Sequence, residues 1–146
     1  MRASRIMAVG TLVVAMTACS GTTSPSSSSP TAPTGTTVRV TLSDFKVVPE
    51  RSSAAAGSVT FEVVTSGDTH DFSVLRTDLP ANALPTGPVD NADITSADIE
   101  VVDSIAPMEF GESATLTLDL SAGNYVLICN IYNHYSLGMT AAFTVS

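Results

Sequence analysis

The chain has 146 residues, of which 14 are acidic and six are basic, and its formal net charge is −8 at neutral pH. This acidic balance excludes a nucleic-acid partner, because binding to phosphates requires clustered Lys and Arg. The length suits one domain of ordinary size with its own hydrophobic core.

The first 18 residues have the layout of a secretory signal peptide. Arg2 and Arg5 form a short basic region, and the mostly apolar stretch 6–16 is too short to cross a bilayer as a helix. The sequence Met16-Thr-Ala-Cys19 resembles a bacterial lipobox, which implies cleavage before Cys19 and lipidation of its thiol. The alternative is an ordinary signal peptide with an incidental cysteine.

Cleavage before Cys19 takes away Arg2 and Arg5, which leaves four basic and 14 acidic side chains and a net charge of −10. We therefore expect an extracytoplasmic protein that is anchored to the cell membrane by lipidated Cys19 and attracted to basic partners. With Cys19 acylated, Cys129 is the only remaining thiol. A lone thiol in an oxidising compartment is a liability unless a metal or another group occupies it.

Residues 19–37 form a low-complexity stretch. After Cys19 it contains only Ser, Thr, Pro, Gly and Ala, so it has no large apolar side chain with which to build a core. We interpret 19–37 as a flexible linker that holds the domain away from the membrane.

From residue 38 onward, apolar and polar residues alternate in short segments. Such alternation, in segments rich in β-branched residues and interrupted by Gly, Pro, Asp and Ser, is typical of a β-sandwich or barrel. No long stretch has a helical period, so we predict an all-β domain over 38–146. The clearest segments are 38–43, 59–64, 72–75, 115–120, 125–129 and 141–145.

Residues 78–99 interrupt this rhythm. The segment contains three prolines and several aspartates, and we predict a loop with one short helix near 96–100. The acidic side chains here are expected to form a solvated face. A calcium site is the weaker alternative, because the D-x-D-x-D-G spacing of a calcium loop is absent. These acidic residues are Asp90, Asp93, Asp98, Glu100 and Asp103.

Three side chains able to bind a soft metal lie close together near the C-terminus. They are Cys129, His134 and Met139, and His70 is the only other histidine in the chain. Two imidazoles, one thiolate and a weakly bound thioether are the ligands of a blue-copper site. Each residue alone is more often a packing residue. Together they leave no histidine unused, so we predict one copper ion.

The segment that begins at Gly123 and ends at Met139, with its Cys-x4-His-x4-Met spacing, resembles the copper loop of the cupredoxins. Within that family it is more similar to the rusticyanin and sulfocyanin loops than to that of plastocyanin. His70 and the residues up to 85 resemble the first-ligand region of small bacterial cupredoxin-like proteins. The resemblance covers 38–146 and implies a Greek-key β-sandwich with one type 1 copper ion. It implies three strong ligands and one axial ligand: His70, Cys129 and His134, with Met139 axial.

Two neighbours of these ligands are expected to support them, Asp71 and Asn130. In the family, the residue after the first His is often Asn or Ser and ties the two ligand-bearing loops together; here it is Asp71. A carboxylate at this place favours Cu(II), whereas the loop spacing suggests a high reduction potential. The two features oppose one another, so no potential is predicted. The loop also has Tyr132-Asn133 where related loops often have Pro-Gly.

The resemblance implies a one-electron carrier. Its partner would be a redox protein with a basic surface, such as a cytochrome or terminal oxidase. A copper carrier or scavenger, which would pass copper to an acceptor protein, uses the same ligands and is the alternative; a third is a module with an idle site. Tyr132, Tyr135 and Leu137 flank His134. They either pack internally or form an apolar collar for partner contact, and we expect the collar for at least one of them.

Enzymatic activity is not expected. Multicopper oxidases need additional His-x-His pairs, and the chain has no third histidine. A two-copper electron-transfer centre needs a second cysteine in the same loop. A Ser-His-acid arrangement would require a histidine that is not committed to copper.

Overall fold

The computed structural model describes residues 35–146, and within this range the chain forms nine strands and no helix. The predicted signal peptide, Cys19 and nearly all of the linker lie outside the described residues. Across the described part of the chain, no helix is long and apolar enough to cross a membrane. The strands are β1 (Thr36–Ser43), β2 (Lys46–Pro49), β3 (Ser53–Ala54), β4 (Gly57–Thr65), β5 (His70–Arg76), β6 (Glu100–Met108), β7 (Ser113–Leu120), β8 (Gly123–Ile128) and β9 (Thr140–Val145).

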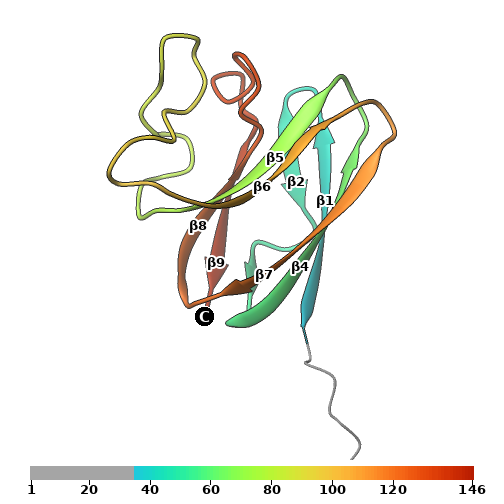
Figure 1. Ribbon diagram of the computed structural model, residues 1–146, viewed down its shortest axis with the longest axis vertical. Coiled ribbons are helices and arrows are strands. Elements are labelled where there is room, and N and C mark those ends of the chain that lie inside the picture. Colours follow the sequence, from blue (N-terminus) through green and yellow to red (C-terminus); the bar gives the residue numbers. More distant parts are fainter. Residues whose placement is uncertain (1–34) are drawn as a thin grey trace, which may run out of the picture. The chain divides into compact units, whose positions relative to one another are not determined.

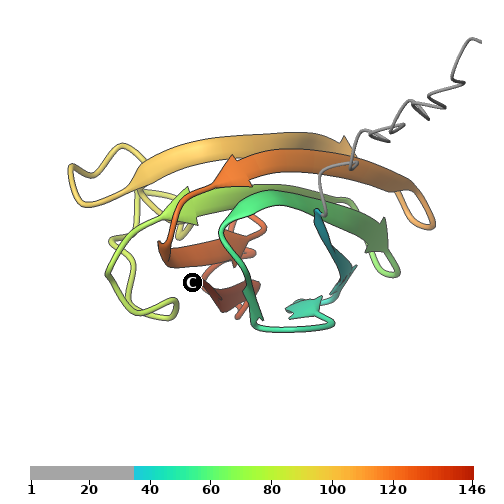
Figure 2. The same cartoon turned by 90° about the horizontal axis from the view of Figure 1, so that it is seen from below.

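The strands form two mixed sheets, which confirms the predicted all-β sandwich (Figure 1). The first sheet has the order β2-β1-β4-β7, with β1 parallel to β4 and the other pairs antiparallel. The second has the order β3-β9-β8-β5-β6, with only the short β3 parallel to its neighbour. The edge strands β6 and β7 follow one another in the chain and run side by side along one flank (Figure 2).

The main core lies between the two sheets. In β1 and β4 the alternate apolar residues are buried and the residues between them are more exposed, as the period of two predicts. The ring of Phe61 in β4 lies 5.6 Å from that of Phe72 in β5 and 5.5 Å from that of Phe143 in β9. These contacts join the sheets through aromatic pairs in tilted and edge-to-face geometry.

A second apolar cluster covers the outer face of the second sheet. Residues 77–99 fold back over β5 and β8, so both strands are buried on both faces. This is why β5 buries four consecutive residues, 72–75, where the alternating pattern predicted two. The cluster contains Leu75, Leu84, Ala92, Ile99, Val126, Ile128 and Tyr135.

The short helix expected near 96–100 does not form. The segment makes a turn in which the Ile99 N–H donates to the Ser96 carbonyl over 3.1 Å. Glu100 then pairs with Arg76 as the first residue of β6, so the strand ladder takes up the backbone groups that a helix would need.

One end of the sandwich gathers the predicted ligands. His70 begins β5, and Cys129 follows the last residue of β8. Since β5 and β8 are antiparallel neighbours, the start of one lies beside the end of the other. The loop 129–139, the segment 77–99 and the β1–β2 turn meet at this end, the upper one in Figure 1.

Candidate metal centre

Three predicted ligands converge at this end of the sandwich. The Nδ1 atoms of His70 and His134 lie 3.3 Å apart, and Cys129 Sγ lies 3.9 Å from the first and 3.3 Å from the second. One ligand atom from each residue therefore falls within 4.8 Å of the others. His70 and Cys129 are fully buried, and His134 is partly exposed.

The loop 129–139 owes its shape to backbone hydrogen bonds. The Cys129 N–H donates to the Met139 carbonyl and the Met139 N–H donates to the His134 carbonyl, both over 3.1 Å. Asn133 and Gly138 have φ angles of 66° and 110°. Asn tolerates the left-handed region better than most residues, and Gly138 has a φ that other side chains rarely adopt. Asn133 thus provides a positive φ in a loop whose relatives often have Pro-Gly.

Met139 is fully buried at the end of the loop, immediately before β9. Its backbone extends the β8–β9 ladder by one step, through the bond from Cys129. The structure therefore places Met139 next to Cys129, where sequence spacing predicts the axial ligand. That role remains a prediction.

Asp71 and Asn130 connect three segments around these residues. The Asn130 N–H donates to Asp71 Oδ1 over 2.6 Å, which ties the start of β5 to the loop 129–139. The Asn130 side chain accepts from the Ala92 N–H over 2.8 Å and donates to the Ala92 carbonyl over 3.2 Å. The resemblance implied that the residue after the first His ties the two ligand-bearing loops together. Here the carboxylate of Asp71 makes this connection.

Tyr135 packs internally, which is the alternative that the sequence left open for it, and it is not part of an exposed collar. It is only 6% exposed, and its hydroxyl accepts from the Leu84 N–H over 2.8 Å and donates to the Ala81 carbonyl over 3.1 Å. Sequence placed it beside His134, but residues 77–99 cover it. Tyr132 and Leu137 are 70% and 48% exposed and remain available to a partner.

No protein-family model matches the chain, and no curated protein matches it. Solved structures do match. Reduced auracyanin from the photosynthetic bacterium Roseiflexus castenholzii is 20% identical with a TM-score of 0.53, and the match covers 79% of this chain and 98% of auracyanin. Auracyanin A from Chloroflexus aurantiacus, described as a "blue" copper protein, is 19% identical with a TM-score of 0.54, covering 77% and 99%. Rusticyanin from Thiobacillus ferrooxidans is 16% identical with a TM-score of 0.55, covering 79% of each chain.

The described domain has the cupredoxin fold. At 20% identity and below, the likeness concerns the fold, and the site has to be assessed from this chain's own residues.

The donor atoms in this domain fit one type 1 copper ion. Two imidazole nitrogens and one sulfur lie within 4.8 Å of one another, and this is the strong-ligand set of such a centre. Burial raises the pKa of the Cys129 thiol to about 12. Since a metal binds the thiolate, a nearby cation is needed to offset the cost of that buried charge.

The second imidazole is also held in its metal-binding form. The pKa of His134 is lowered, first by burial and then by the neighbouring His70, against the opposing charges of Asp71, Asp44 and Asp68. A lowered pKa keeps the ring neutral at neutral pH, and a neutral ring has the free lone pair that a metal needs.

Two residues of the β1–β2 turn complete the site, and sequence reasoning missed both. The Phe45 ring meets the His134 ring edge-on at 5.3 Å, and Asp44 Oδ1 lies 3.2 Å from His70 Nε2. Phe45 is 40% exposed, so it adds to the apolar surface beside His134. In the sequence the two residues simply follow a predicted strand, and they belong to no recognisable motif.

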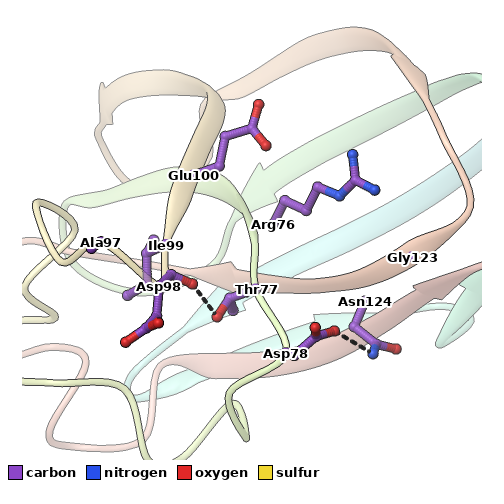
Figure 3. Close-up of a pocket in the computed structure, with 9 residues that line it drawn as sticks. All are labelled: Arg76, Thr77, Asp78, Ala97, Asp98, Ile99, Glu100, Gly123 and Asn124. Atoms are coloured by element: carbon purple, nitrogen blue, oxygen red, sulfur yellow. Dashed lines mark hydrogen bonds between the residues drawn. The ribbon is translucent and has the colours of Figure 1, made fainter.

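The far end of the second sheet contains a hollow of about 320 Å³ whose lining includes none of the predicted copper-site residues (Figure 3). It lies where β5 ends and β8 begins, opposite to the ligand cluster. Several of its polar groups bond to one another: the Thr77 hydroxyl donates to the Asp98 carbonyl over 2.8 Å, and the Asn124 amide donates to Asp78 over 2.9 Å. We therefore assign it no role.

Proposed function

We propose that the protein is a one-electron carrier that holds one type 1 copper ion through His70, Cys129 and His134, with Met139 as the axial ligand. The convergence of two Nδ1 atoms and one Sγ atom at one end of a cupredoxin fold carries this proposal. Bound copper would supply reversible exchange between Cu(II) and Cu(I). A thiolate and two imidazoles with a distant thioether suit neither state perfectly, so little has to rearrange.

The protein's own residues keep the ligands in place and exclude water. The Asp71–Asn130 bond and the buried Tyr135 fix the loop 129–139 from two sides. His134 is the one strong ligand that reaches the surface, where Phe45, Tyr132 and Leu137 expose apolar area. A redox partner with a basic surface would dock here, since long-range attraction to the acidic domain orients the encounter.

This arrangement supports an electron carrier better than a copper carrier. Copper transfer to an acceptor requires the ligands to open one after another, and two of the three strong ligands are fully buried. Electron transfer requires only that a partner approach the exposed edge of His134.

The addition of Cu(II) to the purified protein tests the proposal. We expect one copper per chain and an intense blue or green colour, because charge transfer from the Cys129 thiolate to Cu(II) absorbs strongly in the visible range. Absorption during titration, followed by thiol titration of the product, provides the measurement. A colourless complex with a freely reactive thiol would contradict a type 1 site.

We also propose that lipidated Cys19 anchors the protein outside the cytoplasm. The support is the Met16-Thr-Ala-Cys19 sequence after an apolar stretch and before the linker. Stable anchoring needs more than one acyl chain. We expect Cys19→Ala to move the protein from the membrane fraction to the soluble fraction, as followed by cell fractionation and blotting. Ser20→Ala is the matched control and should leave the distribution unchanged. Equal membrane retention of the Cys19 variant would refute the anchor.

A further inference from the structure

The His70 ring has one nitrogen that the ligand cluster leaves unexplained. Its Nδ1 faces Cys129 and His134, so its Nε2 lies on the opposite side of the ring. This Nε2 is fully buried and makes no hydrogen bond to any residue in 35–146. A buried polar nitrogen without a partner costs free energy, and such an atom in a native structure calls for an explanation.

A carboxylate lies within reach of this nitrogen. Asp44 Oδ1 is 3.2 Å from His70 Nε2, a distance that suits a hydrogen bond although the donor direction does not. Asp44 comes from the β1–β2 turn of the first sheet, whereas His70 begins β5 of the second. A small turn of the half-exposed carboxylate would complete the bond.

The local backbone is shaped to hold Asp44 in this place. Its Oδ1 also accepts the Asp68 N–H over 3.0 Å. Gly67 packs against the same oxygen so closely that a Cβ built on it would lie 2.3 Å from Oδ1. Any residue other than glycine at 67 would therefore displace the carboxylate. Gly67 and the Asp68 N–H thus both contact the oxygen of Asp44 that lies beside the His70 ring.

We propose that Asp44 is a positioning residue for the metal centre: it accepts a hydrogen bond from the Nε2–H of His70 and thereby leaves Nδ1 unprotonated and free to bind the metal. A neutral imidazole carries one proton, and a carboxylate at Nε2 selects the tautomer with the proton there. The negative charge of the same carboxylate makes Nδ1 a stronger electron-pair donor to the metal, and it favours Cu(II) over Cu(I). The effect on metal binding rests on the proposed function, whereas the tautomer exists without metal.

The first test uses the metal-free, full-length protein. Nitrogen-15 NMR of the His70 ring should show a protonated Nε2 and an unprotonated Nδ1. In Asp44→Ala, which removes the acceptor, the ring should become a mixture of tautomers. Asp44→Asn keeps an acceptor oxygen without the charge and should retain the Nε2–H form. Asp68→Asn removes an equal charge from the neighbouring β4–β5 loop without touching the ring, and it should match the parent.

The second test measures copper affinity by competition with a chelator, together with the reduction potential. We expect Asp44→Ala to weaken Cu(II) binding by about 10- to 100-fold, the range found when such supporting partners are removed. Asp44→Asn should fall between this variant and the parent. Both should have a higher reduction potential than Asp68→Asn.

A His70 ring protonated at Nδ1 in the unaltered metal-free protein would overturn the proposal. So would an affinity of Asp44→Ala equal to that of Asp68→Asn. If Asp44→Ala fails to fold, the tautomer of the parent and the copper affinity of Asp44→Asn still decide whether Asp44 positions His70. If the parent binds no copper, the proposed function fails, and the tautomer experiment separately decides the role of Asp44.

Discussion

Replacing Cys129 with serine is expected to abolish the visible colour of the Cu(II)-loaded protein while the domain stays folded. The colour depends on charge transfer from a thiolate, and a hydroxyl cannot supply it. Serine is nearly isosteric with cysteine, and in this buried place its hydroxyl would have His134 Nδ1 as a neighbour. The stability cost should therefore stay within about 1–3 kcal/mol. Visible absorption and thermal unfolding followed by circular dichroism measure the two effects.

The matched control for this variant is Ile128→Val at the neighbouring position. Ile128 is fully buried and belongs to the apolar cluster under residues 77–99. The loss of one methylene there should cost about 0.5–1.5 kcal/mol and preserve the colour. Colour that survived in Cys129→Ser would show that another residue supplies the sulfur or that the site is not type 1.

Leu137→Asp is expected to slow the reduction of the protein by a partner at least about tenfold, because a charge desolvated in a contact costs several kcal/mol. Leu137 is exposed in the ligand-bearing loop, and its side chain is not among the ligands. The copper spectrum should therefore remain nearly unchanged. Stopped-flow reduction with a basic cytochrome provides the measurement.

Val101→Asp is the control for this charge. Val101 is 41% exposed in β6 and pairs with Leu75 near the end of β5 that lies away from the ligands. The Val101→Asp variant should be reduced by the cytochrome at the parental rate. Raising the ionic strength should slow association for parent and control alike, because salt screens the attraction between an acidic protein and a basic partner. Parental rates in Leu137→Asp would mean that electrons leave elsewhere or that the protein carries copper.

The sequence predicted best what depends on local periodicity. Strands β1 and β4 each have one face in the core, so their alternating residues indicate both the strand and its buried side. The proximity of the candidate ligands was predictable for a related reason. Cys129, His134 and Met139 lie in one short loop, so their spacing is fixed by the chain itself, and His70 was the one histidine left to join them.

What the sequence could not predict are contacts between segments that lie far apart in the chain. In the sequence, Tyr135 is an aromatic residue next to a candidate ligand, which suggests a surface position. It is buried because residues 77–99 fold over it. Asp44 approaches His70 because a turn of one sheet meets a strand of the other. Neither contact leaves a periodic signal, since each depends on how the two sheets pack.

The segment 77–99 has a consequence for engineering the domain. By its length and its lack of regular strands, it looks like a place for inserting a tag, a cleavage site or new chain ends. Yet its Leu84 and Ala92 are buried, and its backbone binds the side chains of Tyr135 and Asn130. Cutting it would release the loop 129–139 from one of its supports. The turn between β7 and β8, whose Ser121 and Ala122 are exposed at the opposite end, is the better place for new termini.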